Sequence, residues 1–329
     1  MTLNRRRLLS HATLAGAAFA AGLPMGRAWA DGGKPVRILV GFPPGGGTDA
    51  IARLLADKLK DVLGVSVIVE NRPGAGGQIA AQALKAAPAD GTTVFLTHDH
   101  TISILPQVVK NPGFDPERDF VSVGGVATFV NAFAVSGGTP ARSFDDYVAW
   151  VKQQGGGKSA VGIPAPASTP EFLVKLLGER YRIDLVSAPY RGSAPMIGDM
   201  LGNQIAAGVG SVPDFLENHK AGKLRIVAVL GDRRQGALPD VPTFGELGLK
   251  GFEDLPYYGF YAPAGTPARF VQQFSDALAK VIAQREVHAH LVALGLTVTP
   301  MTPQQLTTRE RAYTQAWTRI IRSSGFQPQ

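Results

Sequence analysis

The stretch VRILVGFPPGGGTDAIARLLADKLKDVL, which runs from Val36 to Leu63, decides how this chain folds. Its first residues are apolar and predict a buried strand, and Asp49–Leu63 predicts an amphipathic helix with one apolar face. The loop between them consists largely of prolines and glycines and carries no positive charge. A glycine loop that leads into a helix leaves backbone N–H groups without partners, and the helix dipole favours an anion beside them. We therefore expect this unit to hold a carboxylate rather than to transform one.

The first glycine loop, Gly41–Asp49, is not a phosphate-binding P-loop, because that motif ends in Gly-Lys-Ser/Thr and this loop ends in Gly-Thr-Asp. Its three consecutive glycines are entropically unfavourable, which predicts close approach of a ligand to the backbone. The alternative is an ordinary turn that Thr48 or Asp49 caps. A second strand and glycine loop follow at Val67–Gly77, with the sequence VIVENRPGAGG. We expect the two loops to form one concave anion site.

Strand-like and helix-like segments alternate along most of the chain, which predicts right-handed crossovers and parallel pairing. The apolar run Val121–Val135 predicts a strand that leaves a first lobe, and Ser136–Pro140 is the predicted hinge. Tyr257–Pro263 predicts a return strand, and helical stretches follow it as far as about Ser323. The pattern indicates a two-lobed α/β protein in which each lobe is a mainly parallel sheet flanked by helices. The predicted lobes are residues 31–135 with 255–329 and residues 136–254, with the ligand cleft between them.

The N-terminal residues 1–30 are typical of an export signal that is cleaved off. The sequence RRRLL at 5–9 supplies a basic region, a mildly apolar run rich in Ala and Gly follows, and AWA at 28–30 offers a cleavage site before Asp31. The paired arginines, the weak apolar run and Arg27 favour twin-arginine export over the general route. The apolar run is shorter than the ~20 residues that span a bilayer, which argues against a membrane anchor.

Composition excludes several classes of function. Residues 1–30 hold four arginines and no acid, so the remaining chain has 29 basic and 26 acidic residues and a net charge of +3, compared with +7 for the whole chain. This small excess gives no reason to expect nucleic acid as a partner. The chain contains no cysteine, which excludes disulfides, thiolate metal sites and a cysteine nucleophile.

The sequence THDHT at 97–101 allows two interpretations. His98 and His100 would share one strand face, but no third ligand group is evident, so a metal site is the weaker interpretation and we expect no cofactor. We expect Thr97 and His98 to hydrogen-bond the ligand instead. His98, Asp99 and His100 are also the acid/base candidates for a rival function, an exported small-molecule hydrolase. A nucleophile elbow is missing, because the turn at 208–213 lacks the closing glycine of G-x-S-x-G.

Two loops in the second lobe precede predicted helices. Ser168-Thr169-Pro170-Glu171 fits a capping box in which Glu171 reaches back to the cap, and the hydroxyls of Ser168 and Thr169 can also bind a ligand. The loop that begins at Tyr190 carries Arg191, which would pair with a ligand carboxylate if it faces the cleft.

With these motifs in view, the chain after residue 30 resembles the Bug-type extracytoplasmic receptors of tripartite tricarboxylate transporters over nearly its whole length. The matching segments occur in order: FPPGGGTDAIAR, ENRPGAGGQIAA, ADGTT, FDPERDF, PYRGSAPMIGDMLGNQI, AGKLRIVAV, LPDVPTFGELG and YAPAGTP. The resemblance implies a two-lobed class II periplasmic binding-protein fold, closure about a hinge, no cofactor, and a small carboxylate as ligand. It also implies that the first-lobe loops hold one ligand carboxylate, partly through water, at Phe42, Gly46, Gly47, Thr48, Asp49, Gly74, Ala75 and Gly76.

Two segments depart from the family pattern, and both concern the distal half of the ligand. Glu171 stands where family members often have histidine, and Tyr257–Tyr261 stands where they often show tryptophan. We expect a monomeric periplasmic receptor that captures a small organic acid between its lobes and delivers it to the membrane permease of a tripartite tricarboxylate transporter. A receptor that signals to a sensor kinase is an open alternative, and the sequence does not name the acid.

Overall fold

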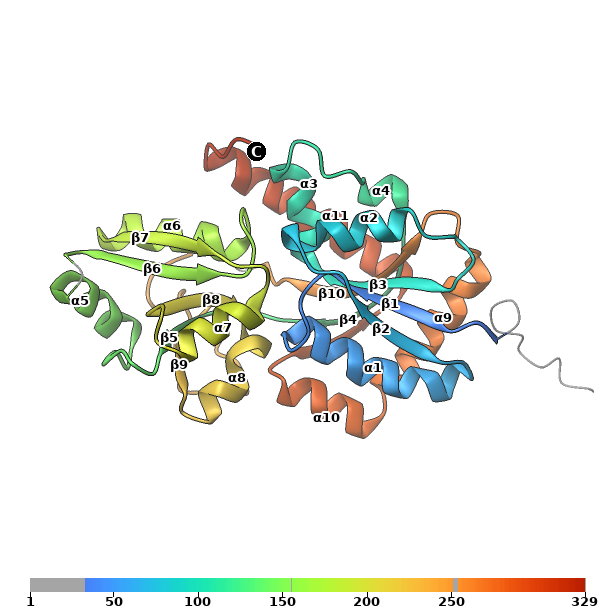
Figure 1. Cartoon of the computed structure of the whole chain (residues 1–329), viewed down its shortest axis with the longest axis horizontal. Coiled ribbons are helices and arrows are strands. Elements are labelled where there is room, and N and C mark those ends of the chain that lie inside the picture. The colour runs from blue at the N-terminus through green and yellow to red at the C-terminus, as the bar shows by residue number, and fades with distance from the viewer. Residues whose placement is uncertain (1–32, 155, 251–253, 329) are drawn as a thin grey trace, which may run out of the picture.

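The computed structural model describes residues 33–154, 156–250 and 254–328, so the predicted export signal at 1–30 lies outside the described residues. Figure 1 shows two lobes side by side, each built around one mixed sheet with helices packed on it. The described part of the chain confirms the two-lobed α/β architecture. The lobes are connected by two short passages of chain, from one sheet to the other and back.

The sheet of the first lobe has six strands in the order β11-β4-β10-β3-β1-β2. Alternate residues of a strand face opposite sides, so Ile38 of β1 joins one core and its neighbour Leu39 joins another. The strands are β1 (Val36–Val40), β2 (Val67–Asn71), β3 (Thr93–His98), β4 (Phe120–Thr128), β10 (Tyr257–Pro263) and β11 (Thr297–Met301). One face is covered by α1 (Gly47–Leu63), α9 (Ala268–Ile282) and α10 (Arg285–Ala293). The other is covered by α2 (Gln78–Lys85), α3 (Leu105–Val108) and α11 (Pro303–Ser323).

The sheet of the second lobe has five strands in the order β7-β6-β8-β5-β9. These strands are β5 (Asn131–Ser136), β6 (Lys158–Ile163), β7 (Asp184–Pro189), β8 (Ala207–Ser211) and β9 (Leu224–Val229). The helices on one face are α5 (Phe144–Gln154) and α6 (Thr169–Tyr181). Those on the other face are α7 (Ser193–Leu201) and α8 (Val212–Lys220).

Both sheets are mixed, which refines the prediction of mainly parallel sheets. The βαβ units pair in parallel as expected, namely β1 with β2 and β3 in one lobe and β6 with β7 and β8 in the other. The strands that follow a passage between lobes are reversed: β10 is antiparallel to β3 and β4, and β5 is antiparallel to β8 and β9. The direction is reversed because the chain crosses from the other lobe, so β10 and β5 each begin at the end of their sheet that faces that lobe.

The first passage between the lobes lies nearer the N-terminus than the predicted hinge at Ser136–Pro140. The apolar run Val121–Val135 forms two strands rather than one, and β5 pairs entirely within the second sheet. The sequence assigned most of β5 to the first lobe, and the predicted hinge Ser136–Pro140 begins at the far end of this strand. Apolar composition alone cannot locate such a passage, because both sheets bury the run. We propose that the lobes divide at residues 129–130 and again at 254–256.

Three elements carried no clear sequence signal. Strand β11 is short and mostly exposed, and α4 (Pro116–Asp119) is a single turn. A helical segment that begins with a π-helical turn at His100–Ile104 continues into α3. This segment matters for the site, because it carries buried polar residues to the end of β3.

A buried acid on α11 lies against β10 of the first-lobe sheet. Glu310 is 9 % exposed, and burial raises its pKa from 4.5 to about 7. The charge of Glu117 adds to this increase, whereas Tyr261 and Arg311 oppose it. The unfolded chain loses this proton near pH 4.5 but the folded protein loses it near pH 7, so the free energy of unfolding falls as the pH rises through that window.

We therefore expect Glu310→Gln to raise the melting temperature by about 5 °C at pH 8 and to change it little at pH 5, where the folded wild type is already protonated. Thermal unfolding across pH 5–8 measures the effect. Glu179→Gln, at an exposed acid of α6, serves as the control and should follow the wild type. An unchanged pH dependence in Glu310→Gln would show that this carboxyl group does not control stability.

Candidate functional site

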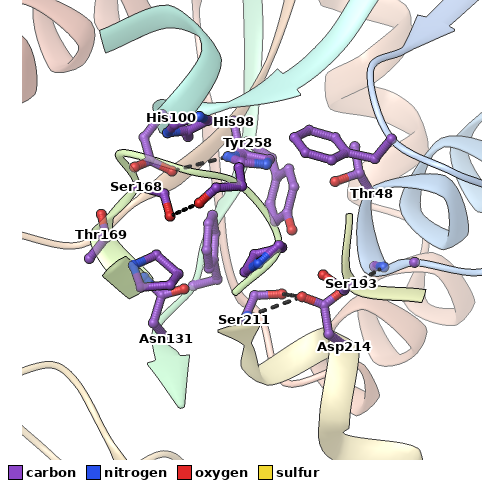
Figure 2. Close-up of a pocket in the computed structure, with 18 of the residues that line it drawn as sticks. Thr48, His98, His100, Asn131, Ser168, Thr169, Ser193, Ser211, Asp214 and Tyr258 are labelled. Atoms are coloured by element: carbon purple, nitrogen blue, oxygen red, sulfur yellow. Dashed lines mark hydrogen bonds and ion pairs between the residues drawn. The ribbon is translucent and has the colours of Figure 1, made fainter. Parts of the chain in front are cut away.

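Loops from both lobes enclose a cavity at the lobe interface (Figure 2). The cavity is about 50 Å³, which holds only a few water molecules, so a larger ligand requires the lobes to separate. The first lobe contributes Phe42, Pro43, Gly46, Gly47, Thr48, His98, Asp99, His100, Phe129 and Tyr258. The second lobe contributes Asn131, Pro164, Ala165, Ser168, Thr169, Pro170, Ser193, Ser211 and Asp214.

The first glycine loop brings the N-terminus of α1 to this cavity. Gly46 is the N-cap of the helix, and Gly45 has the positive φ of 87° that the turn before it requires. Helix α1 begins at Gly47, so the N–H groups of its first turn have no partner within the helix. Thr48 follows directly and is 6 % exposed. The predicted anion-binding geometry is therefore present at this loop.

Asp49 organises the first loop from behind and does not line the cavity. Its carboxylate accepts hydrogen bonds from the Gly45 N–H at 3.0 Å, from Arg53 at 2.9 Å and from Asn71 at 2.9 Å. Burial alone would raise the pKa of Asp49, but these hydrogen bonds outweigh burial and lower the pKa. Asp49 thus remains ionised and fixes the turn, which differs from the ligand contact implied by the family resemblance.

The second glycine loop packs against protein rather than against the cavity. A Cβ atom on Gly41 would lie 2.7 Å from the Cα of Gly77, so the two loops touch backbone to backbone. A Cβ on Gly76 would lie 2.5 Å from Nε2 of His100. Gly74, Ala75 and Gly76 are absent from the cavity lining, so the predicted joint nest does not form at the cavity. Close packing against other protein atoms explains the glycines of this loop. Such packing requires glycine for the same reason that a ligand close to the backbone would, because a Cβ atom would not fit.

Aromatic rings form one wall of the cavity. The ring of His98 stacks on Phe42 at 4.8 Å and meets Phe129 and Tyr258 edge to face at 5.9 and 5.7 Å. The ring centroids of Phe129 and Tyr258 lie 4.7 Å apart. Burial raises the pKa of the Tyr258 hydroxyl, and the negative charge of Asp214 raises it further, so this tyrosine stays neutral. The wall offers apolar area together with polar edges, as small-molecule sites usually do.

Several buried polar atoms of the lining residues have no hydrogen-bond partner within the part of the chain that the structure describes: Nδ1 of His98, Nδ1 of His100 and Oγ1 of Thr169. His98 Nδ1 lies 3.3 Å from Asp99, but the geometry is not that of a hydrogen bond. Burial and, to a smaller extent, neighbouring His98 lower the pKa of His100 to about 4 despite the opposing charge of Asp99, so His100 is neutral at physiological pH. Buried polar groups normally have partners, so these atoms are available to water or to a polar ligand in the cavity.

Asp99 is positioned from the rear by α11. The hydroxyl of Tyr313 donates to Asp99 Oδ2 at 2.8 Å, and both residues are buried. Within the described part of the chain, no group of three or more His, Asp or Glu residues is arranged to hold a metal ion. The two histidines do not share one strand face as predicted, because His98 is the last residue of β3 and His100 is the first residue of the π-helical turn.

The capping box predicted at 168–171 is wrong in detail. Ser168 is the N-cap of α6, but its hydroxyl donates to the Ala165 carbonyl at 2.6 Å instead of capping the helix. Glu171 accepts from the N–H of Ala167 and lies outside the cavity. Ser168 and Thr169 do line the cavity, as expected (Figure 2).

Arg191 does not reach the cavity. Its side chain is exposed, whereas Ser193 two residues later is one of the lining residues. A Cβ on the intervening Gly192 would lie 2.5 Å from Cδ of Pro43, so this loop closes on the first lobe at the rim. The loop that begins at Tyr190 therefore reaches the cavity through Ser193 and not through Arg191.

Of the predicted residues, seven line the cavity and six do not. Those that line it are Phe42, Gly46, Gly47, Thr48, His98, Ser168 and Thr169. Those that do not are Asp49, Gly74, Ala75, Gly76, Thr97 and Arg191. Thr97 is fully buried in β3, next to His98. Among the residues that the sequence missed, Asp214 directly follows the turn at 208–213, and Tyr258 lies on the predicted return strand.

Comparison with known proteins identifies the family. The model of the tripartite tricarboxylate transporter family receptor matches residues 51–326. This chain belongs to that family. Protein BugT of Bordetella pertussis is 31 % identical to it over 89 % of this chain and 90 % of that protein. The solved structure of the periplasmic binding protein BugD superposes with a TM-score of 0.84 at 29 % identity, covering 90 % of this chain and 99 % of BugD.

A second solved structure, of a protein from R. palustris with adipate, also superposes with a TM-score of 0.84, at 28 % identity over 90 % of this chain and 99 % of that one. The expected two-lobed periplasmic binding-protein fold is confirmed. Because the family consists of receptors, this receptor binds a solute rather than converting it, and the hydrolase alternative is not supported. No helix within residues 33–154, 156–250 and 254–328 is long and apolar enough to cross a membrane.

Proposed function

We propose that this receptor captures a small organic acid in the cleft between its lobes and delivers it to the permease of a tripartite tricarboxylate transporter. The observation that carries the proposal is the meeting of the α1 N-terminus with unpaired polar atoms of His98, His100 and Thr169 at one interlobe cavity. Backbone N–H groups at a helix start bind anions without a cationic side chain. The adipate in the related structure is consistent with a carboxylate ligand.

The contact residues that we propose come from both lobes. Phe42 and His98 would cover the ligand body, and Gly46, Gly47 and Thr48 would receive a carboxylate. Ser168 and Thr169 would bind it from the second lobe. Because no lysine or arginine is among the described residues that line the cavity, binding should depend on neutral donors and only weakly on salt.

Export is part of the same proposal. A receptor of this family acts outside the cytoplasm, and residues 1–30 would direct twin-arginine export with cleavage near Ala30-Asp31. We propose a monomer that works with the membrane permease, whereas signalling to a sensor kinase would use the same cleft and the same closure.

The test is a thermal-shift screen of residues 31–329 against mono-, di- and tricarboxylates, acidic amino acids and aromatic acids. A ligand that binds only the folded protein raises the melting temperature by mass action, by an amount that grows with concentration over Kd. We expect one class of acid to raise it clearly. Neutral analogues of each acid, such as the amide, are the matched controls. No response to any acid would refute a carboxylate ligand for this cleft.

A further inference from the structure

The structure holds a carboxylate of its own at the N-terminus of α1. Oδ1 of Asp214, at the start of α8 in the second lobe, accepts a hydrogen bond from the Gly47 N–H of the first lobe at 2.9 Å. Figure 2 shows this contact at the cavity, with Ser211 beside Asp214. A negative charge from one lobe therefore already satisfies one of the donors that the other lobe offers to an anion.

Asp214 is held in place by its own helix. Its Oδ2 accepts from the Ser211 N–H at 3.0 Å and from the Ser211 hydroxyl at 2.6 Å. Three donors suit an ionised carboxylate, which can only accept, and the N-terminus of α8 favours the same charge. The space around the contact is small, because a Cβ on Gly47 would lie 3.1 Å from Cβ of Pro213 and 3.2 Å from Oδ1 of Asp214.

Among the described residues, the cavity lining offers neither a lysine nor an arginine to balance this charge, and it includes a second acid, Asp99. His98 and His100 lie across the cavity from Asp214 (Figure 2), and burial keeps His100 neutral by lowering its pKa to about 4. A ligand with two carboxylates would therefore place at least one of them near a fixed negative charge, and like charges brought together in an interface are strongly unfavourable.

We propose that Asp214 is a specificity-determining residue that competes for the anion position at the α1 N-terminus, so that the cleft favours acids with one negative charge over dicarboxylates. The inference rests on the proposed function, since it concerns the ligand of the same cleft. Where Asp214 keeps the Gly47 N–H, the single carboxylate would use the remaining groups of the same site, at Gly46, Thr48, His98, His100 and Thr169. The end of the ligand near Asp214 would carry a hydroxyl or amino group, which can donate a hydrogen bond to the Asp214 carboxylate.

The test compares four acids of equal chain length by calorimetry: hexanoate, 6-hydroxyhexanoate, 6-aminohexanoate and adipate. Wild type, Asp214→Asn and Asp214→Ser are measured, and Glu217→Gln removes a charge from the exposed side of the same helix as a control. We expect Asp214→Asn to raise the affinity for adipate relative to hexanoate by about tenfold or more and to weaken 6-aminohexanoate. Equal adipate-to-hexanoate ratios in wild type and both Asp214 variants would overturn the proposal.

A second measurement needs no ligand. Small-angle scattering of the protein without added acid should give a larger radius of gyration for Asp214→Asn and Asp214→Ser than for wild type and Glu217→Gln, because the Gly47–Asp214 contact joins the lobes. Identical radii would overturn the proposal. If none of the four acids binds any variant, the proposed function fails for these acids. The scattering then still decides whether Asp214 joins the lobes by occupying the anion position at the α1 N-terminus.

Discussion

Gly47→Asp is expected to lower ligand affinity by about 100-fold or more, measured by calorimetry with whichever acid the thermal-shift screen identifies. The new side chain would start 3.1 Å from Cβ of Pro213 and 3.2 Å from Oδ1 of Asp214, a distance at which the lobes cannot close without a shift. It would also place a second carboxylate at the N–H groups that are proposed to receive the ligand. Steric and electrostatic effects therefore act in the same direction.

The matched control is Gly236→Asp, which makes the same substitution at an exposed glycine with open space around it. Its affinity should equal that of the wild type, because a Cβ at Gly236 would meet nothing within 4 Å. Wild-type affinity in Gly47→Asp would show that the ligand does not use the α1 N-terminus.

Gly41→Ala should have the largest effect on stability. The added methyl group would lie 2.7 Å from Cα of Gly77 and 3.4 Å from its carbonyl oxygen, and backbone atoms cannot move aside as a flexible side chain can. Overpacking of this kind destabilises by about 3 kcal/mol, which corresponds to a decrease of roughly 10 °C in melting temperature. Thermal unfolding followed by circular dichroism provides the measurement.

Gly198→Ala in α7 is the control, because nothing lies within 4 Å of a Cβ there and alanine is the better helix former. It should be neutral or stabilise by up to about 1 kcal/mol. If Gly41→Ala melted like the wild type, the two glycine loops would not be packed backbone to backbone, and the ligand would again be a plausible reason for the second loop.

Local patterns predicted the elements of both lobes well. The apolar spacing in Asp49–Leu63 matches α1, and the helical stretches expected between the return strand and about Ser323 appear as α9, α10 and α11. The first loop reaches the interlobe cavity, which Phe42, Gly46, Gly47 and Thr48 line. These predictions succeed because periodicity, capping and glycine placement act within a few residues.

The second glycine loop shows where such reasoning ends. Gly74, Ala75 and Gly76 meet the same criteria as the first loop, yet they lie against Ile79, His100 and neighbouring groups instead of the cavity. Glycine indicates that something approaches the backbone closely, but not whether that is a ligand or another part of the chain. Arg191 shows a related limit, since Ser193 lines the cavity and Arg191, two residues earlier in the same loop, does not.

The amino-acid sequence established the family, the alternating strand–helix units and a first loop suited to an anion, because each depends on the order of neighbouring residues. Only the tertiary structure decided which loops share a cavity and which charge faces them. Gly47 and Asp214 are 167 residues apart in the chain and meet through the packing of two lobes. No local pattern records such a contact, because the order of strands in each sheet and the closure of the lobes set its position.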